Sequence, residues 1–234
     1  MTRRETGAED AVTPGEDGAK SVMSGKHGPK PVVTSGEGSP NAVAAWLATG
    51  TEMFLAAVDG LPGPAFAAPS LLPGWSRAHV VAHVHFNAEA LRRLTHWART
   101  GEPTPMYPGG RRDAEIQDGA TQPPGHLRDL VRASAAALAA DFAGLSADAL
   151  ANTVVTAQGR SVPAAEIAWL RAREVMVHTV DLDTGIAFPD LPEDFTTALV
   201  ADVIAQRCRA GEAAGLASWL TGRAPQAPSL GTWL

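Results

Sequence analysis

Long segments with apolar residues at helical spacing, separated by loops rich in Pro and Gly, dominate the chain and constrain its fold. The first segment shows the pattern in full: Ser39 is a residue type that caps helices, Pro40 suits the first helical turn, and Gly60 favours the end of a helix. The spacing predicts helices over residues 39–60, 76–101, 126–143, 163–183 and 193–213. The sequence therefore predicts a mainly helical fold.

Extended structure is predicted at only one place. The β-branched run from Thr153 to Thr156 favours a short extended piece, and Gly159 favours a turn before Pro163 opens the fourth helix. A further short helix is predicted near 113–118. Four long helices that can pack antiparallel predict an all-α, up-and-down four-helix bundle, with an extra C-terminal helix and a short C-terminal extension.

Composition divides the chain into three parts. Residues 1–38 are rich in Gly, Ser, Thr, Pro, Lys and Glu and have no apolar period, so they are predicted to form a disordered tail. Residues 39–190 form the predicted bundle, and residues 191–234 hold the last helix and a short extension. Four apolar residues of this extension are expected to pack on the bundle or against a second subunit: Trp219, Leu220, Trp233 and Leu234.

The composition argues against several classes of function. The net charge of −6 gives no basic footprint for nucleic acid, and the chain has no run of 18 apolar residues that would predict a membrane span. The N-terminus lacks the apolar stretch of a secretory signal. The single cysteine, Cys208, excludes an intramolecular disulfide and is typical of a reducing compartment, so we expect a cytoplasmic location.

Ionisable side chains gather on two of the predicted helices. Glu174 and His178 lie one turn apart on the fourth helix, and His83 lies on the second. If the two helices are neighbours, the three side chains converge. Two imidazoles and a carboxylate form a ligand set for a catalytic zinc ion that keeps a fourth position open, and bundle cores often hold such sites.

Each of these residues also has a structural interpretation. A histidine on a helix is more often a half-buried, hydrogen-bonded residue than a ligand, and Glu174 could instead pair with Arg171 or point to solvent. Asp181 is either the carboxylate that orients His178 or a solvated acid. The remaining helical histidines are interpreted as structural or surface residues: His85, His96 and His126.

Four segments carry a resemblance to a known family: LLPGWSRAHVVAHVHFNAEAL, HWARTGEPTPMY, VTAQGRSVPAAEIAWLRAREVMVHTVDL and, more faintly, WLTGR with the terminal TWL. They are similar to the mycothiol-dependent maleylpyruvate isomerase family, a branch of the DinB-like helical bundle superfamily. In that family the second His of AHVVAHV and the Glu and His of REVMVH bind a divalent metal, usually zinc. The resemblance thus implies His83, Glu174 and His178 as metal ligands. His79 competes as a ligand or lines the pocket, and with Asn87 on the same face it is expected to contact the cofactor.

The reaction that the resemblance implies is the cis–trans isomerisation of maleylpyruvate to fumarylpyruvate in the gentisate pathway, with mycothiol as cofactor. A thiolate adds to the conjugated alkene, the new single bond rotates, and the thiolate leaves. Free thiols are mostly protonated at neutral pH, and a zinc ion with an open position deprotonates a coordinating thiol. Cys208 is interpreted as a small buried hydrophobe, so an external thiol is expected.

A substrate with two carboxylates needs a cationic partner, and an Arg fork suits a carboxylate. The family uses an Arg in its C-terminal part, which implies Arg223 of LTGR, and Arg160 of AQGRS is the second candidate; Arg77 and Arg173 are weaker ones. Family members with this activity have a second small α/β domain after the bundle. Residues 191–234 are too few for such a domain and are interpreted as a reduced remnant of it.

Two other functions remain open at this point. A thiol S-transferase on the same scaffold would leave the thiol attached to an electrophile, and a non-catalytic bundle would bind a metal or a partner without turnover. The expected partners are a small-molecule substrate and a low-molecular-weight thiol, with no nucleic acid and no membrane. The sequence does not indicate an oligomeric state.

Overall fold

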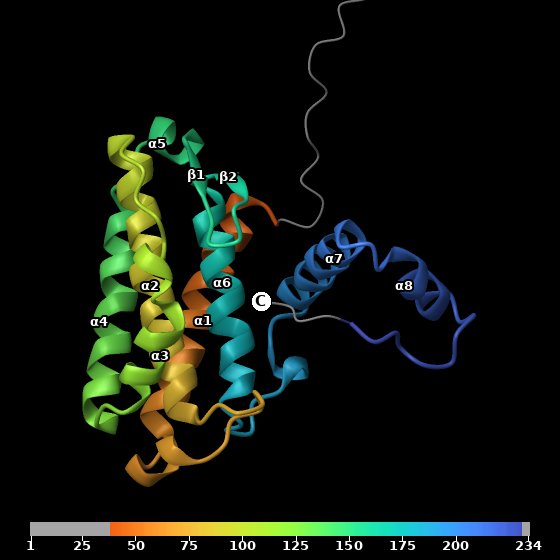
Figure 1. Ribbon diagram of the computed structural model, residues 1–234, viewed down its shortest axis with the longest axis horizontal. Coiled ribbons are helices and arrows are strands. Elements are labelled where there is room, and N and C mark those ends of the chain that lie inside the picture. The colour runs from red at the N-terminus through yellow and green to blue at the C-terminus, as the bar shows by residue number, and fades with distance from the viewer. Residues whose placement is uncertain (1–37, 231–234) are drawn as a thin grey trace, which may run out of the picture. The chain divides into compact units, whose positions relative to one another are not determined.

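The computed structural model describes residues 38–230, and Figure 1 shows long helices side by side in a bundle. The predicted tail, apart from Gly38, and the apolar residues Trp233 and Leu234 lie outside the described residues. The helices are α1 (Pro40–Gly60), α2 (Arg77–Thr100), α3 (Arg112–Ala120), α4 (Pro124–Ala143), α5 (Ala147–Ala151), α6 (Glu166–Asp181), α7 (Glu193–Arg209) and α8 (Ala213–Leu220). The strands are β1 (Thr153–Val155) and β2 (Ser161–Pro163), and the 3₁₀ turns are η1 (Gly63–Ala67), η2 (Pro108–Gly110) and η3 (Phe188–Asp190).

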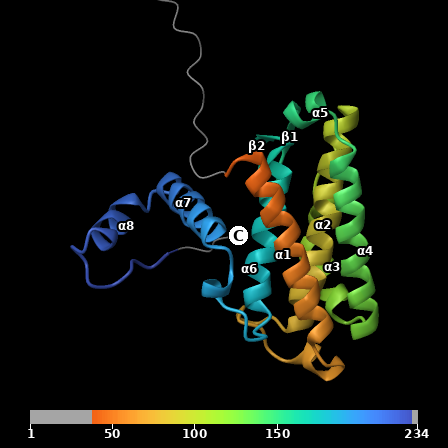
Figure 2. The same ribbon diagram turned by 180° about the vertical axis from the view of Figure 1, so that it is seen from behind.

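The bundle consists of α1, α2, α4 and α6, in which α1 packs along α6, α2 packs along α4, and α2 also contacts α6 (Figures 1 and 2). α1 and α6 run in the same direction, because Trp46 meets Trp169 near their N-terminal ends and Gly50 faces Val175 further along. The prediction of an all-α helical bundle is confirmed. α1 is also long and apolar enough to cross a membrane, a test that core helices of soluble proteins pass as well.

α2 and α4 also run in the same direction, antiparallel to the other pair. Arg92 pairs with Asp141 at 2.6 Å toward their C-terminal ends, while Val80 and Leu127 share a core cluster near their N-terminal ends. This orientation follows from the connection between them, residues 101–123, which runs back along α2 and includes α3 (Figure 1). The expected short helix near 113–118 is thereby confirmed as α3.

The region before α6 differs from the prediction. Pro163 does not open a helix but lies in β2, opposite Thr153 of β1. The next two amides donate to carbonyls of the preceding segment, Ala164 to Asn152 and Ala165 to Leu150. These bonds hold the chain in the hairpin, so α6 begins only at Glu166; α5 and β2 were not predicted.

α6 is the most enclosed helix of the bundle. All ten residues from Arg171 to Val180 are buried, so the helix has no solvent-facing stripe over this stretch. The helix ends at Asp181, close to the predicted end at 183. Any polar side chain between 171 and 180 therefore needs a partner inside the protein.

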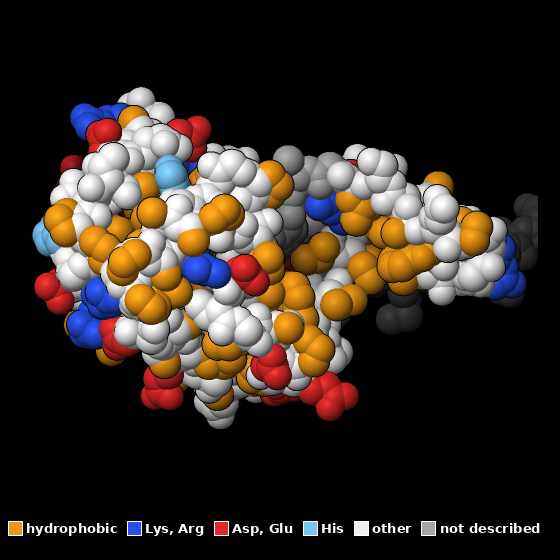
Figure 3. Space-filling view, turned by 90° about the horizontal axis from the view of Figure 1, so that it is seen from below, with side chains coloured by type: hydrophobic (Ala, Val, Ile, Leu, Met, Phe, Trp, Pro, Cys, Tyr) orange, Lys and Arg blue, Asp and Glu red, His pale blue; other side chains and the backbone are white. Residues whose placement is uncertain are grey.

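The C-terminal part contains two helices where one was predicted. α7 ends at Arg209, before the predicted end at 213, and α8 occupies a segment that was expected to be irregular. Hydrophobic side chains also lie on the surface among charged ones (Figure 3), and large ones are exposed after residue 190: Val200, Trp219, Leu220 and Leu230. Trp219 and Leu220 are 41% and 55% exposed, so they do not pack into the bundle core.

Candidate metal centre

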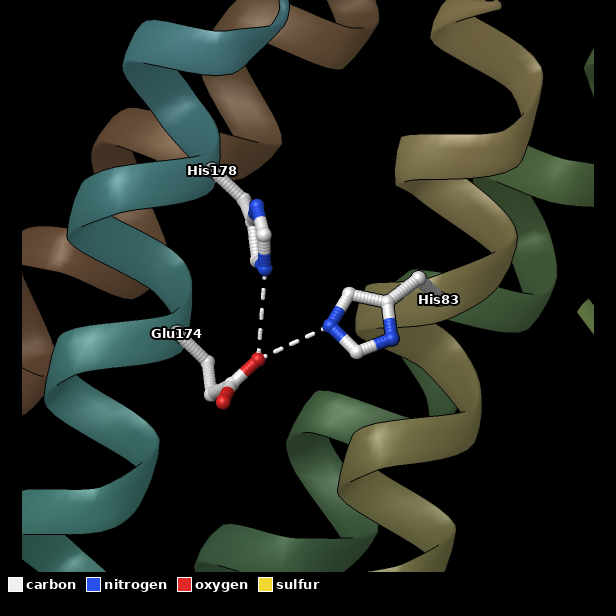
Figure 4. A group of neighbouring side chains, drawn as sticks. All are labelled: His83, Glu174 and His178. Carbon is white, nitrogen blue, oxygen red and sulfur yellow. Dashed lines mark hydrogen bonds and ion pairs between the residues drawn. The ribbon is translucent and has the colours of Figure 1, made fainter. Parts of the chain in front are cut away.

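Three buried side chains from α2 and α6 meet in the bundle, as Figure 4 shows. Nε2 of His83 lies 2.9 Å from Oε2 of Glu174, and Nε2 of His178 lies 3.3 Å from the same oxygen. Glu174 and His178 share a face because they are one turn apart on α6, and the antiparallel packing of α2 brings His83 opposite them. The convergence predicted from the sequence is present in the structure.

A fourth residue fixes the orientation of His178. Oδ2 of Asp181 lies 2.7 Å from Nδ1 of His178, and the Asp181 side chain is only 15% exposed. Of the two interpretations of Asp181, the structure therefore supports the orienting carboxylate. Because Nδ1 is engaged, Nε2 of His178 is the nitrogen that faces Glu174, an arrangement common among metal-binding histidines.

Burial and close contacts set the charges of the group. Burial by itself would raise the pKa of Glu174, but side-chain hydrogen bonds with His178 and His83 hold this pKa well below its usual range. Burial would lower the pKa of His178, yet Asp181 and Glu174 raise it to about 9, whereas burial lowers the pKa of His83. The carboxylate is thus ionised, the form in which it binds metal, and a cation entering the group would displace the proton of His178.

The geometry fits a divalent cation. The three candidate ligand atoms lie within 4.8 Å of one another, and all three residues are buried. Donor atoms around a tetrahedral zinc ion, with bonds of about 2.0–2.2 Å, lie about 3.3 Å apart, close to the 2.9 and 3.3 Å that separate Oε2 of Glu174 from the two imidazole nitrogens. Two imidazole nitrogens that converge on one oxygen of a buried, ionised carboxylate form a ligand set prepared for a cation.

A cavity of about 210 Å³ opens beside His83 and Glu174. Its other walls come from α2, the 101–112 connection, the hairpin loop and α6: Asn87, Leu91, Met106, Tyr107, Arg112, Thr156, Ala157, Gln158, Leu170 and Arg173. The residues from the connection and the hairpin loop were not predicted as site residues. A signal was present, because a long loop rich in Pro and Gly without helical periodicity is a common carrier of binding residues.

The two residues predicted to contact the cofactor have protein partners. His79 closes the capping box of α2, accepting a hydrogen bond from the backbone N–H of Ser76 at Nδ1, and its Nε2 lies 3.1 Å from Oε1 of Gln117. It does not belong to the group of converging ligands. Asn87 does line the cavity, and its Oδ1 accepts a hydrogen bond from the buried guanidinium of Arg171.

The two arginines predicted to bind the substrate lie outside the set that lines this cavity. Arg160 is exposed at the end of the hairpin loop and pairs with Glu166 at 3.6 Å. Arg223 is exposed after α8, and its guanidinium donates to the carbonyl of Thr221. Arg173, a weaker candidate from the sequence, is the one that reaches the cavity wall.

The remaining predicted residues have structural surroundings. Arg77 donates to the carbonyls of Leu182 and Asp183 and so ties α2 to the end of α6. Cys208 is exposed on α7, so its interpretation as a buried hydrophobe was wrong; it lies near the end of α7, beyond the part that packs on the bundle through Phe195 and Leu199. The other histidines are half-buried or exposed and lie outside the converging ligands: His85, His96 and His126.

Comparison with known proteins finds similarity to one family. The family model described as "Mycothiol maleylpyruvate isomerase N-terminal domain" matches residues 35–183. A crystal structure of the mycothiol-dependent maleylpyruvate isomerase is 40% identical, with a TM-score of 0.71, over 74% of this chain and 72% of that one. A His-to-Ala mutant of the mycothiol-dependent maleylpyruvate isomerase is likewise 40% identical, with a TM-score of 0.68, over 70% and 69% of the two chains. No curated protein matches the chain.

Proposed function

Because the chain belongs to the mycothiol maleylpyruvate isomerase family, we propose that it is a mycothiol-dependent isomerase that converts maleylpyruvate, or a close analogue, to fumarylpyruvate. The observation that carries the proposal is the buried group of His83, Glu174 and His178, of which His83 and Glu174 line a small cavity. The chain that carries this group is 40% identical in sequence to a mycothiol-dependent maleylpyruvate isomerase.

His83, Glu174 and His178 would hold a divalent cation, and zinc is the ion that a His₂Glu set with an open position suits best. When bound, such an ion lowers the pKa of a coordinating thiol so that the thiolate forms at neutral pH. His₂Glu sets accept other divalent ions as well, so elemental analysis has to identify the native metal.

The chain's own residues prepare the site. Asp181 fixes the ring of His178 through Nδ1, and the Trp75 ring packs edge-on against His83, with the ring centroids 5.5 Å apart. The cavity of about 210 Å³ is smaller than the roughly 300–1,000 Å³ of most ligand pockets. We therefore expect it to admit the reacting ends of thiol and substrate and to exclude most water, which favours thiolate attack over side reactions.

Two groups of sequence-based predictions complete the proposal. Arg223 and Arg160 stay predictions as carboxylate-binding residues, and alanine variants that lower substrate use without changing metal content would support them. The expected partners are mycothiol and a small dicarboxylate, and the expected location is the cytoplasm, where such a thiol remains reduced.

The test combines metal analysis with a thiol-dependent assay on the purified chain. We expect close to one divalent ion per chain, and maleylpyruvate isomerisation only when mycothiol is added, with the free thiol concentration constant over many turnovers. Stoichiometric loss of thiol would instead indicate an S-transferase. Bound metal without any thiol-dependent chemistry would indicate a non-catalytic bundle, and either result would overturn the proposal.

A further inference from the structure

Tyr107, the only tyrosine of the chain, lies in the wall of the same cavity as His83 and Glu174. The connection that carries it is held at the preceding residue: Arg93 of α2 donates to the carbonyl of Met106 at 2.9 Å, and the Met106 side chain is buried. The thioether of Met106 also accepts from the backbone N–H of Ala157 in the hairpin loop. Tyr107 is therefore presented to the cavity by a fixed backbone although it lies in a loop.

Arg112, which begins α3, lies beside Tyr107 in the cavity wall, near enough for its guanidinium to act on the phenol, and it also donates to Oδ1 of Asp113 at 3.0 Å. A guanidinium can only donate hydrogen bonds, whereas a phenol can both accept and donate. Arg112 can therefore interact only with the lone pairs of the Tyr107 oxygen, which leaves the O–H for a ligand in the cavity.

The phenol also stays protonated at working pH. Burial, together with the negative charge of Glu174, raises the pKa of Tyr107 to about 12, although Arg112 opposes this rise. Other polar groups of the cavity have protein partners that hold them in the wall: Asn87 accepts from Arg171, and Arg173 pairs with Asp202 of α7 at 2.8 Å. Tyr107 is thus a neutral donor at a fixed position beside the candidate ligands.

We propose that Tyr107 is a catalytic residue that donates a hydrogen bond to the enolate oxygen of the reacting substrate, and that Arg112 is the positioning residue that holds the phenol in place. The inference rests on the proposed function, because it assigns a role within that reaction. The role requires a cis-alkene conjugated to a ketone, as in maleylpyruvate, because the carbonyl oxygen then takes up the charge.

The chemistry balances without a further reactant. The thiolate sulfur forms a bond to the alkene carbon that lies β to the ketone, and the π electron pair moves onto the ketone oxygen, giving an enolate. Tyr107 stabilises this oxygen by a hydrogen bond and keeps its proton. After rotation about the new single bond, the electron pair of the enolate re-forms the alkene in the trans arrangement and the sulfur leaves as thiolate. Preorganised donors of this kind act on charge that develops in the transition state.

Tyr107→Phe in the metal-loaded enzyme is the direct test, since it removes only the hydroxyl. We expect kcat to fall by about 10²–10³-fold, the usual loss for one oxyanion donor, with little change in KM, metal content or circular dichroism. An active wild type together with an undiminished kcat in Tyr107→Phe would overturn this inference alone. An inactive wild type would instead overturn the proposed function.

Arg112→Met tests the positioning role, with Arg111→Met as the matched control because Arg111 is the exposed neighbour outside the cavity wall. We expect a smaller kcat loss in Arg112→Met than in Tyr107→Phe and none in Arg111→Met. The loss from Arg112→Met should disappear in the Tyr107→Phe background, since Arg112 acts through the phenol. If the two effects multiply instead, Arg112 acts independently and the positioning role is wrong.

Discussion

α6 forms two interfaces of opposite character. Toward α1 it presents apolar side chains: Trp169 meets Trp46 at 5.8 Å between ring centroids, and Met176 packs beside Gly50. Toward α2 it presents polar side chains, among them Glu174, which lies 2.9 Å from His83. One helix thus carries both a packing surface and the candidate metal site.

Burial does not distinguish the two interfaces, because Met176 is 0% and His178 4% exposed. Their partners do. An apolar side chain loses only its packing when a neighbour is removed, whereas a buried ionisable group also loses the compensation for its desolvation. The α1–α6 interface therefore stabilises the fold, and the α2–α6 interface is expected to be complete only with a cation in place.

The largest effect should come from breaking the polar interface. His83→Ala removes one ligand, so we expect metal content to fall to background and thiol-dependent activity to drop by at least about 10²-fold. Helicity measured by circular dichroism should stay close to that of the wild type. His126→Ala, an exposed histidine on α4, is the control and should retain metal. Unchanged metal in His83→Ala would show that the ligand assignment is wrong.

Breaking the apolar interface should lower stability and leave the metal in place. Met176→Ala deletes a fully buried side chain and should lower the free energy of unfolding by about 2–5 kcal/mol in denaturant titrations. Metal content per folded chain should not change. Val200→Ala, at a side chain 57% exposed on α7, should stay within about 0.5 kcal/mol of the wild type. Loss of metal from folded Met176→Ala would show that the two interfaces are not separate.

A smaller change to the polar interface removes the carboxylate that orients His178, one of the candidate metal ligands. Asp181→Asn weakens the contact with Nδ1 of His178, so metal affinity in competition with a chelator should fall by about 10–100-fold. Asp183→Asn is the control: Asp183 is exposed, and its backbone has a φ of 51°, which Asn tolerates well. Equal affinities of the two variants would contradict the orienting role of Asp181.

The polar interface could be predicted from the sequence to a large extent. The spacing of Glu174 and His178 places them on one helical face, and the resemblance to a family selects His83 from several helical histidines. The cavity wall could not be predicted in the same way. Tyr107 and Arg112 lie in a connection without periodicity, and only the return of residues 101–123 along α2 brings them to the site.

The wrongly predicted boundary at Pro163 and the missed helix α8 each have an identifiable cause. Pro163 is typical of a first helical turn, but pairing of Val162 with Val154 in the hairpin outweighed that preference. α8 was missed because its short apolar run is followed by a Pro-rich segment that favours irregular structure. In the hairpin, contacts between segments decided the structure, and such contacts are not encoded in the periodicity of a single segment.

The smallest expected effect tests how closely α1 and α6 approach. A Cβ at Gly50 would lie 2.8 Å from Cγ2 of Val175 and 2.9 Å from Cγ of Met176. Gly50→Ala should therefore lower the free energy of unfolding by about 1–2 kcal/mol, because overpacking exceeds the gain in helix propensity. Gly60→Ala, where a Cβ meets nothing within 4 Å, should be neutral or slightly stabilising.

The double variant Gly50→Ala with Met176→Ala decides whether this close approach is the cause. The shorter side chain at position 176 makes room for the added methyl group, so the combined loss in the free energy of unfolding should be smaller than the sum of the two single losses. Additive losses would place the strain at Val175, whose β-branched side chain cannot move aside as easily. Metal content should match the wild type in all of these variants, since each change lies on the apolar side of α6.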